Sequence, residues 1–68
     1  MTTGELVRER RKALGLSQEE LANKISKSSQ LISHIETGRR PITPDIAILL
    51  EGQLSIPKET LVFGEVNG

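Results

Sequence analysis

The sequence predicts an all-α fold, a compact bundle of about five short helices, and three observations lead to this prediction. Helix start and stop signals recur at close spacing along the 68 residues, and no stretch shows the apolar–polar alternation of a strand. With one Phe and no Tyr or Trp, the core must be built from Leu, Ile, Val and Ala. The absence of Cys excludes disulfides and thiolate metal sites, so apolar packing alone must hold the fold together. We expect residues 1–68 to form a single domain.

The first two helices are each expected to begin with a capping box, in which a Ser or Thr and a Glu three residues later bind each other's backbone N–H groups. Thr2 with Glu5 starts the first helix, and Gly15 ends it in a left-handed conformation. Ser17 with Glu20 starts the second helix. The apolar residues at helical spacing, which we expect to face the core, are Leu6, Val7, Ala13 and Leu14, then Leu21, Ala22 and Ile25.

Three further helices follow. Ser28 can cap a third helix, which stops at Gly38, and Thr43 before a proline can cap a fourth, whose last turn is weakened by Gly52. Pro57 opens a short fifth helix that runs to residue 61, and the tail of about residues 64–68 is expected to be flexible. The residues expected to be apolar contacts are Leu31, Ile32 and Ile35 in the third helix and Ile46, Ala47, Leu49 and Leu50 in the fourth.

Charge is distributed unevenly, although nine basic and nine acidic residues cancel. From Arg8 to Arg40, eight basic residues face four acidic ones, whereas from Pro41 onward one Lys faces four acids. This asymmetry is typical of a nucleic-acid-binding surface, and ordinary solvated helix faces would also explain it. The longest apolar run, Ile46–Leu50, is too short to cross a membrane, and no secretory signal is present, so we expect a cytoplasmic protein.

The second and third helices are joined by only a few residues, which is the spacing of a helix-turn-helix over about residues 17–37. Residues 15–22 (GLSQEELA) and 28–38 (SSQLISHIETG) resemble the Cro and phage-repressor (XRE-type) family, and the resemblance covers about residues 5–61. It implies a lambda-repressor-like DNA-binding domain of bacterial or phage origin, which regulates transcription by binding double-stranded DNA through the major groove without a cofactor. Ser26 and Lys27 depart from the family pattern, which has Gly and an apolar residue there, and Arg10 replaces an apolar residue.

The resemblance places the start of the third helix against the DNA bases. The base-reading residues that it implies are Ser29, Gln30, Ser33 and His34. Helix geometry agrees, because at about 100° per residue Gln30 and His34 lie opposite Ile32. A Gln side chain can pair with adenine and a Ser side chain with several bases. The alternative interpretation is an ordinary polar surface, although such surfaces tend to carry Lys and Glu.

Phosphate contacts are implied at helix amino-termini, which carry free N–H groups and partial positive charge, and in the loop after the third helix. The phosphate-binding residues assigned in this way are Gln18, Ser28, Arg39 and Arg40, with Arg10, Lys12 and Lys27 as weaker candidates. The two loop arginines have an alternative role in solubility. The family also pairs a late Arg of the first helix with the acid before the loop Gly, here Arg11 with Glu36, as a structural pair.

Catalysis is excluded by the available side chains. Ser33, His34 and Glu36 supply triad residue types, but close neighbours on one helix do not face each other, and there is no second His. A single recognition helix reads too few base pairs, so we expect a homodimer on a near-palindromic operator. The candidate dimer contacts are Leu61, Val62 and Phe63, whose alternative role is to close the core.

A second interpretation is a HigA-type antitoxin, because residues 40–45 (RPITPD) and 54–57 (LSIP) resemble the matching part of those proteins. The resemblance implies that the chain masks a toxin and autoregulates its operon. A toxin or antirepressor is therefore a possible protein partner, in addition to operator DNA.

Overall fold

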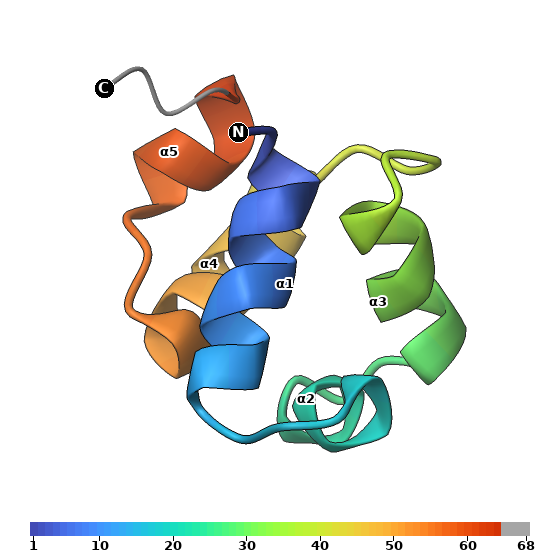
Figure 1. Ribbon diagram of the computed structural model, residues 1–68. Coiled ribbons are helices and arrows are strands. Elements are labelled where there is room, and N and C mark those ends of the chain that lie inside the picture. Colours follow the sequence, from blue (N-terminus) through green and yellow to red (C-terminus); the bar gives the residue numbers. More distant parts are fainter. Residues whose placement is uncertain (65–68) are drawn as a thin grey trace.

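Five α-helices form the part of the chain that the structure describes, which is residues 1–64 of a computed structural model (Figure 1). The helices are α1 (Thr3–Ala13), α2 (Gln18–Lys24), α3 (Ser29–Glu36), α4 (Pro44–Leu54) and α5 (Lys58–Phe63). Residues 1–64 contain no strand, so the predicted all-α class is confirmed. The predicted flexible tail lies, apart from Gly64, outside the described residues.

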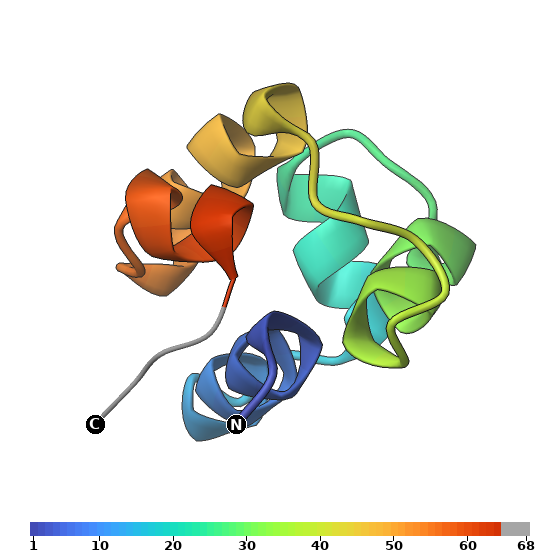
Figure 2. The ribbon, with the colours of Figure 1, turned by 90° about the horizontal axis from the view of Figure 1, so that it is seen from above.

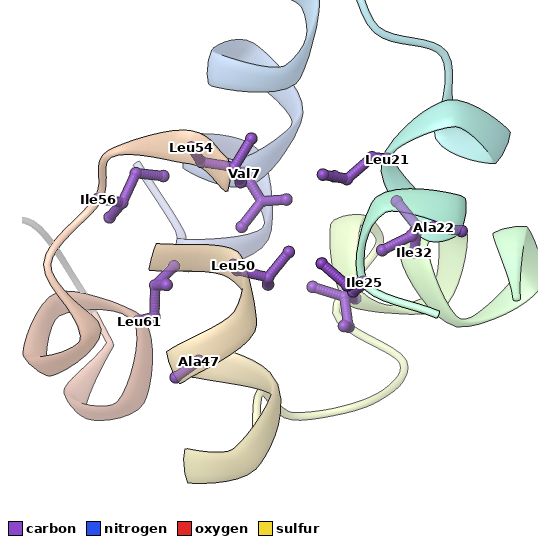
Figure 3. Packing of buried hydrophobic residues seen from close by; sticks show 11 residues of the cluster. Val7, Leu21, Ala22, Ile25, Ile32, Ala47, Leu50, Leu54, Ile56 and Leu61 are labelled. Carbon is purple, nitrogen blue, oxygen red and sulfur yellow. The ribbon is translucent and has the colours of Figure 1, made fainter. Parts of the chain in front are cut away.

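The helices divide into two groups. Figures 1 and 2 show α2 and α3 side by side on one side of the molecule and α4 and α5 on the other, and α1 contacts both groups. Apolar side chains from all five helices meet between them (Figure 3). The core residues are Val7, Leu21, Ala22, Ile25, Ile32, Ile35, Ala47, Leu50, Leu54, Ile56 and Leu61. Because the burial of each Leu or Ile side chain is worth about 1.5–3 kcal/mol, this cluster is the main stabilising element.

Local signals set the starts of α1 and α2 as predicted, whereas Thr43 at the start of α4 makes no side-chain capping bond. Both capping boxes form: the Glu5 N–H donates to Thr2 Oγ1 at 3.1 Å and the Thr2 N–H donates to Glu5 Oε1 at 2.8 Å. In the second box the corresponding distances for Ser17 and Glu20 are 3.0 and 2.9 Å. The backbone N–H groups at both helix starts are therefore satisfied by nearby side chains.

Three predicted core residues are exposed instead. Ala13 and Leu14 lie at the end of α1, where Leu14 is 52% exposed, because α1 turns Gly4, Val7 and Arg11 inward. Leu49 in α4 is also exposed. Helical periodicity alone does not indicate where the neighbouring helix lies. The side of α1 and of α4 that was predicted to face the core therefore differs from the side that does.

The ends of α4 and α5 also differ from the prediction. The fourth helix, traced in the sequence to Leu50 with a weakened last turn at Gly52, continues to Leu54 and stops at Ser55 in the left-handed region (φ 57°). The fifth helix runs two residues further than expected, to Phe63.

Two long-range contacts hold α1 in place. A Cβ atom on Gly4 would lie 2.8 Å from the carbonyl oxygen of Glu36 and closer still to that of Ile35, so only Gly fits where α1 meets the end of α3. Arg10 Nη1 donates to the carbonyl oxygens of Leu54 (2.8 Å) and Ser55 (3.3 Å), which satisfies the end of α4. Arg10 is thus engaged within the protein through Nη1, and its role as a weak phosphate candidate stays a prediction.

Candidate nucleic-acid interface

The turn between α2 and α3 has the geometry of a helix-turn-helix. Ser26 adopts the left-handed conformation (φ 58°), which a Gly would adopt without steric cost. The Lys27 N–H donates to the Ala22 carbonyl at 2.9 Å and closes the turn. The departure from Gly at this position therefore leaves the turn conformation intact.

The two faces of α3 differ sharply. Ile32 and Ile35 are buried in the core, whereas Ser29 and Gln30 at the start of the helix are exposed. Ser33 and His34, one turn further along, are half-buried. None of the four predicted base-reading residues belongs to the apolar core, and Ser29 and Gln30 are the most open to solvent. All four side chains can donate or accept hydrogen bonds, and none of them is a Lys, Arg, Asp or Glu.

Three predicted phosphate-binding residues lie at the two ends of α3. At its start, Ser28 Oγ accepts the N–H of Leu31 at 3.2 Å, which leaves the hydroxyl hydrogen as a donor. At its end, Gly38 (φ 81°) turns the chain back, and the N–H groups of Arg39 and Arg40 donate to the His34 carbonyl at 2.8 and 3.2 Å. These bonds attach the loop to the helix, and both Arg side chains are exposed. The donors are thus separated by the length of α3, about 12 Å for eight residues.

A buried network connects α1, α2 and α3 behind this face. Arg11 Nε donates to Glu36 Oε2 at 2.6 Å, Arg11 Nη2 donates to Glu36 Oε1 at 3.1 Å, and Arg11 Nη1 donates to the Leu16 carbonyl at 2.8 Å. The predicted Arg11–Glu36 pair is therefore present and is nearly excluded from solvent. The hydrogen bonds to Glu36 raise the pKa of Arg11, so the charge on the guanidinium is stabilised.

Comparison with known families agrees with this geometry. The sequence model of the helix-turn-helix family matches residues 7–61, which is most of the chain. The chain belongs to the Cro/C1-type helix-turn-helix family. Members of this family are DNA-binding regulatory domains and not enzymes. A search of curated proteins found no match. Within residues 1–64, no helix is long and apolar enough to cross a membrane.

Gln18 makes a contact within the helix-turn-helix that sequence reasoning missed. Its Nε2 donates to Glu36 Oε1 at 3.0 Å, so the amide is held against the buried pair. Because Nε2 carries two hydrogens, one remains for a phosphate oxygen. No sequence signal joins residues 18 and 36, since the contact depends on how α2 packs against α3. The remaining weak phosphate candidates, Lys12 and Lys27, are exposed.

The three candidate dimer contacts of the helix-turn-helix domain occupy different environments. Leu61 is 2% exposed and belongs to the core, whereas Phe63 is 84% exposed. Val62 is half-buried at the edge of the core. The two alternative roles are therefore divided between neighbouring residues: Leu61 closes the core, and Phe63 is open to a partner.

Proposed function

We propose that this protein is a sequence-specific transcriptional regulator that binds a near-palindromic DNA operator as a homodimer, with α3 in the major groove. The observation that carries the proposal is the exposed, uncharged polar start of α3, flanked at both ends by phosphate-type donors. Such an operator would lie on cytoplasmic DNA, in a bacterium or under the control of a phage.

In this proposal, one set of side chains provides affinity for DNA and another set provides sequence specificity. Gln30 and Ser29 at the exposed start of α3 can reach base edges, and a Gln amide matches the donor and acceptor that adenine presents in the major groove. Arg39 and Arg40 at the other end of α3 carry charge without base-specific geometry and suit phosphates. Base contacts and phosphate contacts would thus come from different side chains, which mutations can separate.

A homodimer supplies the selectivity that one helix lacks. One α3 of eight residues can contact only a few base pairs, and two half-sites one helical turn apart, about 34 Å, double the sequence that is read. A two-fold dimer requires inverted half-sites, so the operator should be near-palindromic. Whether it acts as a repressor or an activator depends on where that operator lies.

The test compares Gln30→Ala with Gln53→Ala, which removes an exposed Gln from α4 on the other side of the molecule. Measured by fluorescence anisotropy on the preferred site, Gln30→Ala should cost about 1–3 kcal/mol and relax the preference at one base position, with Gln53→Ala equal to wild type. An unchanged sequence preference in Gln30→Ala would mean that α3 does not read the bases.

Substitution of the loop arginines should affect DNA binding differently from substitution of Gln30. Arg39→Ala or Arg40→Ala should weaken binding to all sequences alike and reduce the slope of log K against log[salt] by about 1 for each lost contact. A loss confined to the preferred sequence would assign these side chains to base reading instead.

The antitoxin alternative uses the same DNA interface and adds a protein ligand. The sequence similarity of residues 40–45 and 54–57 to HigA-type antitoxins supports it. Expression with the adjacent genes followed by purification tests it, because a co-purifying toxin would favour the antitoxin over the simple regulator.

A further inference from the structure

An open groove of about 770 Å³ is lined by the start of α1, the segment after α3 and the end of α5. We call it the Arg8–Arg40 groove, after the two arginines in its lining, one from α1 and one from the segment after α3. Its apolar residues include Ile35, Ile42 and Val62. A groove of this size that combines apolar side chains with a few charged groups is typical of small-molecule sites.

The two arginines of the groove have no acidic partner in the part of the chain that the structure describes. Arg8 and Arg40 are both exposed, and the one ion pair within 4 Å among residues 1–64 joins Arg11 to Glu36. Two acids also line the groove, but the charge of Glu36 is neutralised by Arg11, which leaves only that of Glu5. Two positive charges and one negative charge remain, so the lining favours an anion.

The apolar part of the groove is open to a ligand as well. Ile42 and Val62 pack against the core, yet both are only half-buried, so part of each side chain faces water in the groove. A ligand that covered them would remove apolar surface from water, which favours binding. A small inorganic anion would leave this surface exposed.

We propose that the Arg8–Arg40 groove binds a small amphipathic carboxylate, with its head group at the two arginines and its apolar chain over Ile42 and Val62. A guanidinium can bind both oxygens of a carboxylate through parallel N–H···O hydrogen bonds. The single charge of a carboxylate also matches the excess of one positive charge in the lining, whereas a phosphate monoester carries nearly two negative charges.

The same ligand would compete with DNA for one side chain. Arg40 lines the groove and is also one of the residues proposed to bind DNA phosphates. A carboxylate bound to Arg40 would remove it from the DNA backbone and weaken operator binding. DNA would weaken binding of the carboxylate by the same factor, because coupling between two ligands is reciprocal. This step rests on the proposed function, whereas binding of the carboxylate does not.

Octanoate is the probe for the ligand site, and NMR amide shifts of the full chain without DNA follow its binding at constant ionic strength. The shifts of groove residues such as Gly38, Ile42 and Val62 should saturate with a Kd on the order of 1 mM, since a small ligand in an open groove binds weakly. Acetate lacks the apolar chain and octylamine carries the opposite charge. Each should bind at least about tenfold more weakly than octanoate.

Three variants test the head-group position. Arg8→Gln and Arg40→Gln should each weaken octanoate binding about two- to fivefold, which is the usual effect of losing one exposed charge pair. Arg39→Gln is the matched control, because it removes an exposed Arg next to Arg40 that does not line the groove, and it should leave octanoate binding unchanged. All three side chains are exposed, so the variants should fold normally.

Operator affinity with and without saturating octanoate, at fixed ionic strength, tests the competition for Arg40. Octanoate should weaken operator binding by wild type, at most by the factor that Arg40→Gln loses without octanoate. It should weaken operator binding by Arg40→Gln much less, because that variant has no Arg40 contact to lose. An equal loss in both proteins would overturn the competition.

Three results would overturn the ligand site: no saturable binding of octanoate, binding of acetate or octylamine as tight as that of octanoate, or equal effects of Arg8→Gln and Arg39→Gln. Shifts confined to the separate groove around Ile48 and Phe63 would overturn it too. Failure of the proposed function is a different result. If wild type binds octanoate in the Arg8–Arg40 groove and binds no DNA sequence selectively, the regulator proposal fails and the ligand site stands.

Discussion

Gly4 lies where α1 contacts the end of α3. This close contact explains why a glycine occupies a position inside a helix. A side chain there would press on the carbonyl oxygens of Ile35 and Glu36. We predict that Gly4→Ala lowers the free energy of unfolding by about 1–3 kcal/mol, because neither backbone segment can yield easily. Urea denaturation followed by circular dichroism measures this change.

Gly52→Ala is the matched control, since a Cβ atom at Gly52, in the last turn of α4, meets nothing within 4 Å. It should raise the free energy of unfolding by about 0.5–1 kcal/mol, because Ala restricts the unfolded chain more than Gly does. If both variants were equally stable, the close approach of α1 to α3 would be refuted.

A second prediction concerns the contribution of the buried Arg11–Glu36 pair to folding stability. Arg11→Met leaves the buried Glu36 carboxylate with the Gln18 amide as its remaining side-chain partner, and should cost about 3–5 kcal/mol of folding stability. The double variant Arg11→Met/Glu36→Met should recover part of that loss, because no unpaired charge remains buried. A double variant less stable than Arg11→Met alone would contradict this expectation, because it would show that the Glu36 carboxylate stabilises the fold even without Arg11.

The contacts that sequence analysis missed were missed for one physical reason, which is that they join distant parts of the chain. Arg11 and Glu36 were predicted because the family resemblance supplied the pairing. Arg10, by contrast, contacts Leu54 and Ser55, which lie more than 40 positions further along the chain. Nothing in the local sequence indicates a contact over such a separation. The tight fit at Gly4 likewise depends on packing that only the assembled fold specifies.

At the scale of helices, the sequence predicted where helices begin, but it predicted only part of the face that each helix buries. Thr2, Ser17 and Ser28 cap their helices because the partners lie within three residues. The orientation of each helix depends on its neighbours, which explains why Leu14 and Leu49 were wrongly placed in the core. Local chemistry therefore predicts where a helix begins, and tertiary packing decides which side it buries.

The capping boxes make stability depend on pH. The backbone N–H of Thr2 and that of Ser17 donate to Glu5 and Glu20 and lower the pKa of each carboxyl below its ordinary value. A pKa that is lower in the folded state adds stability above the unfolded value, and that stability is lost as the pH falls through the folded value. We predict that the free energy of unfolding decreases as the pH falls from about 5 to about 3.

The variant Glu5→Gln/Glu20→Gln keeps the capping hydrogen bonds without a titrating group, so its stability should change less over this range. Chemical denaturation at several pH values measures the difference, with Glu9→Gln as the control for loss of a charge at an exposed position of α1. A double variant that loses stability as steeply as wild type would show that the boxes do not cause the pH dependence.

At the scale of the whole molecule, the fold separates two surfaces. Helix α3, with its exposed start, lies on one side of the molecule, and α4 and α5, whose residues line an open groove, lie on the other (Figure 2). This separation would allow a partner to bind α4 and α5 without covering α3. The helix-turn-helix face was predictable from the sequence because its residues are close together in the chain, whereas the groove joins residues 44–48 to residues 58–63 and becomes visible only in the fold.

The central claim is that α3 reads a specific DNA sequence as one half of a two-fold pair. Selection of binding sites from random double-stranded DNA by the full chain tests this claim most directly. We predict an enriched sequence with two inverted half-sites whose centres are about 10 base pairs apart, and loss of the preference at one position of each half-site in Gln30→Ala. Selection that enriches no sequence, or that enriches single half-sites without a fixed spacing, would contradict the account.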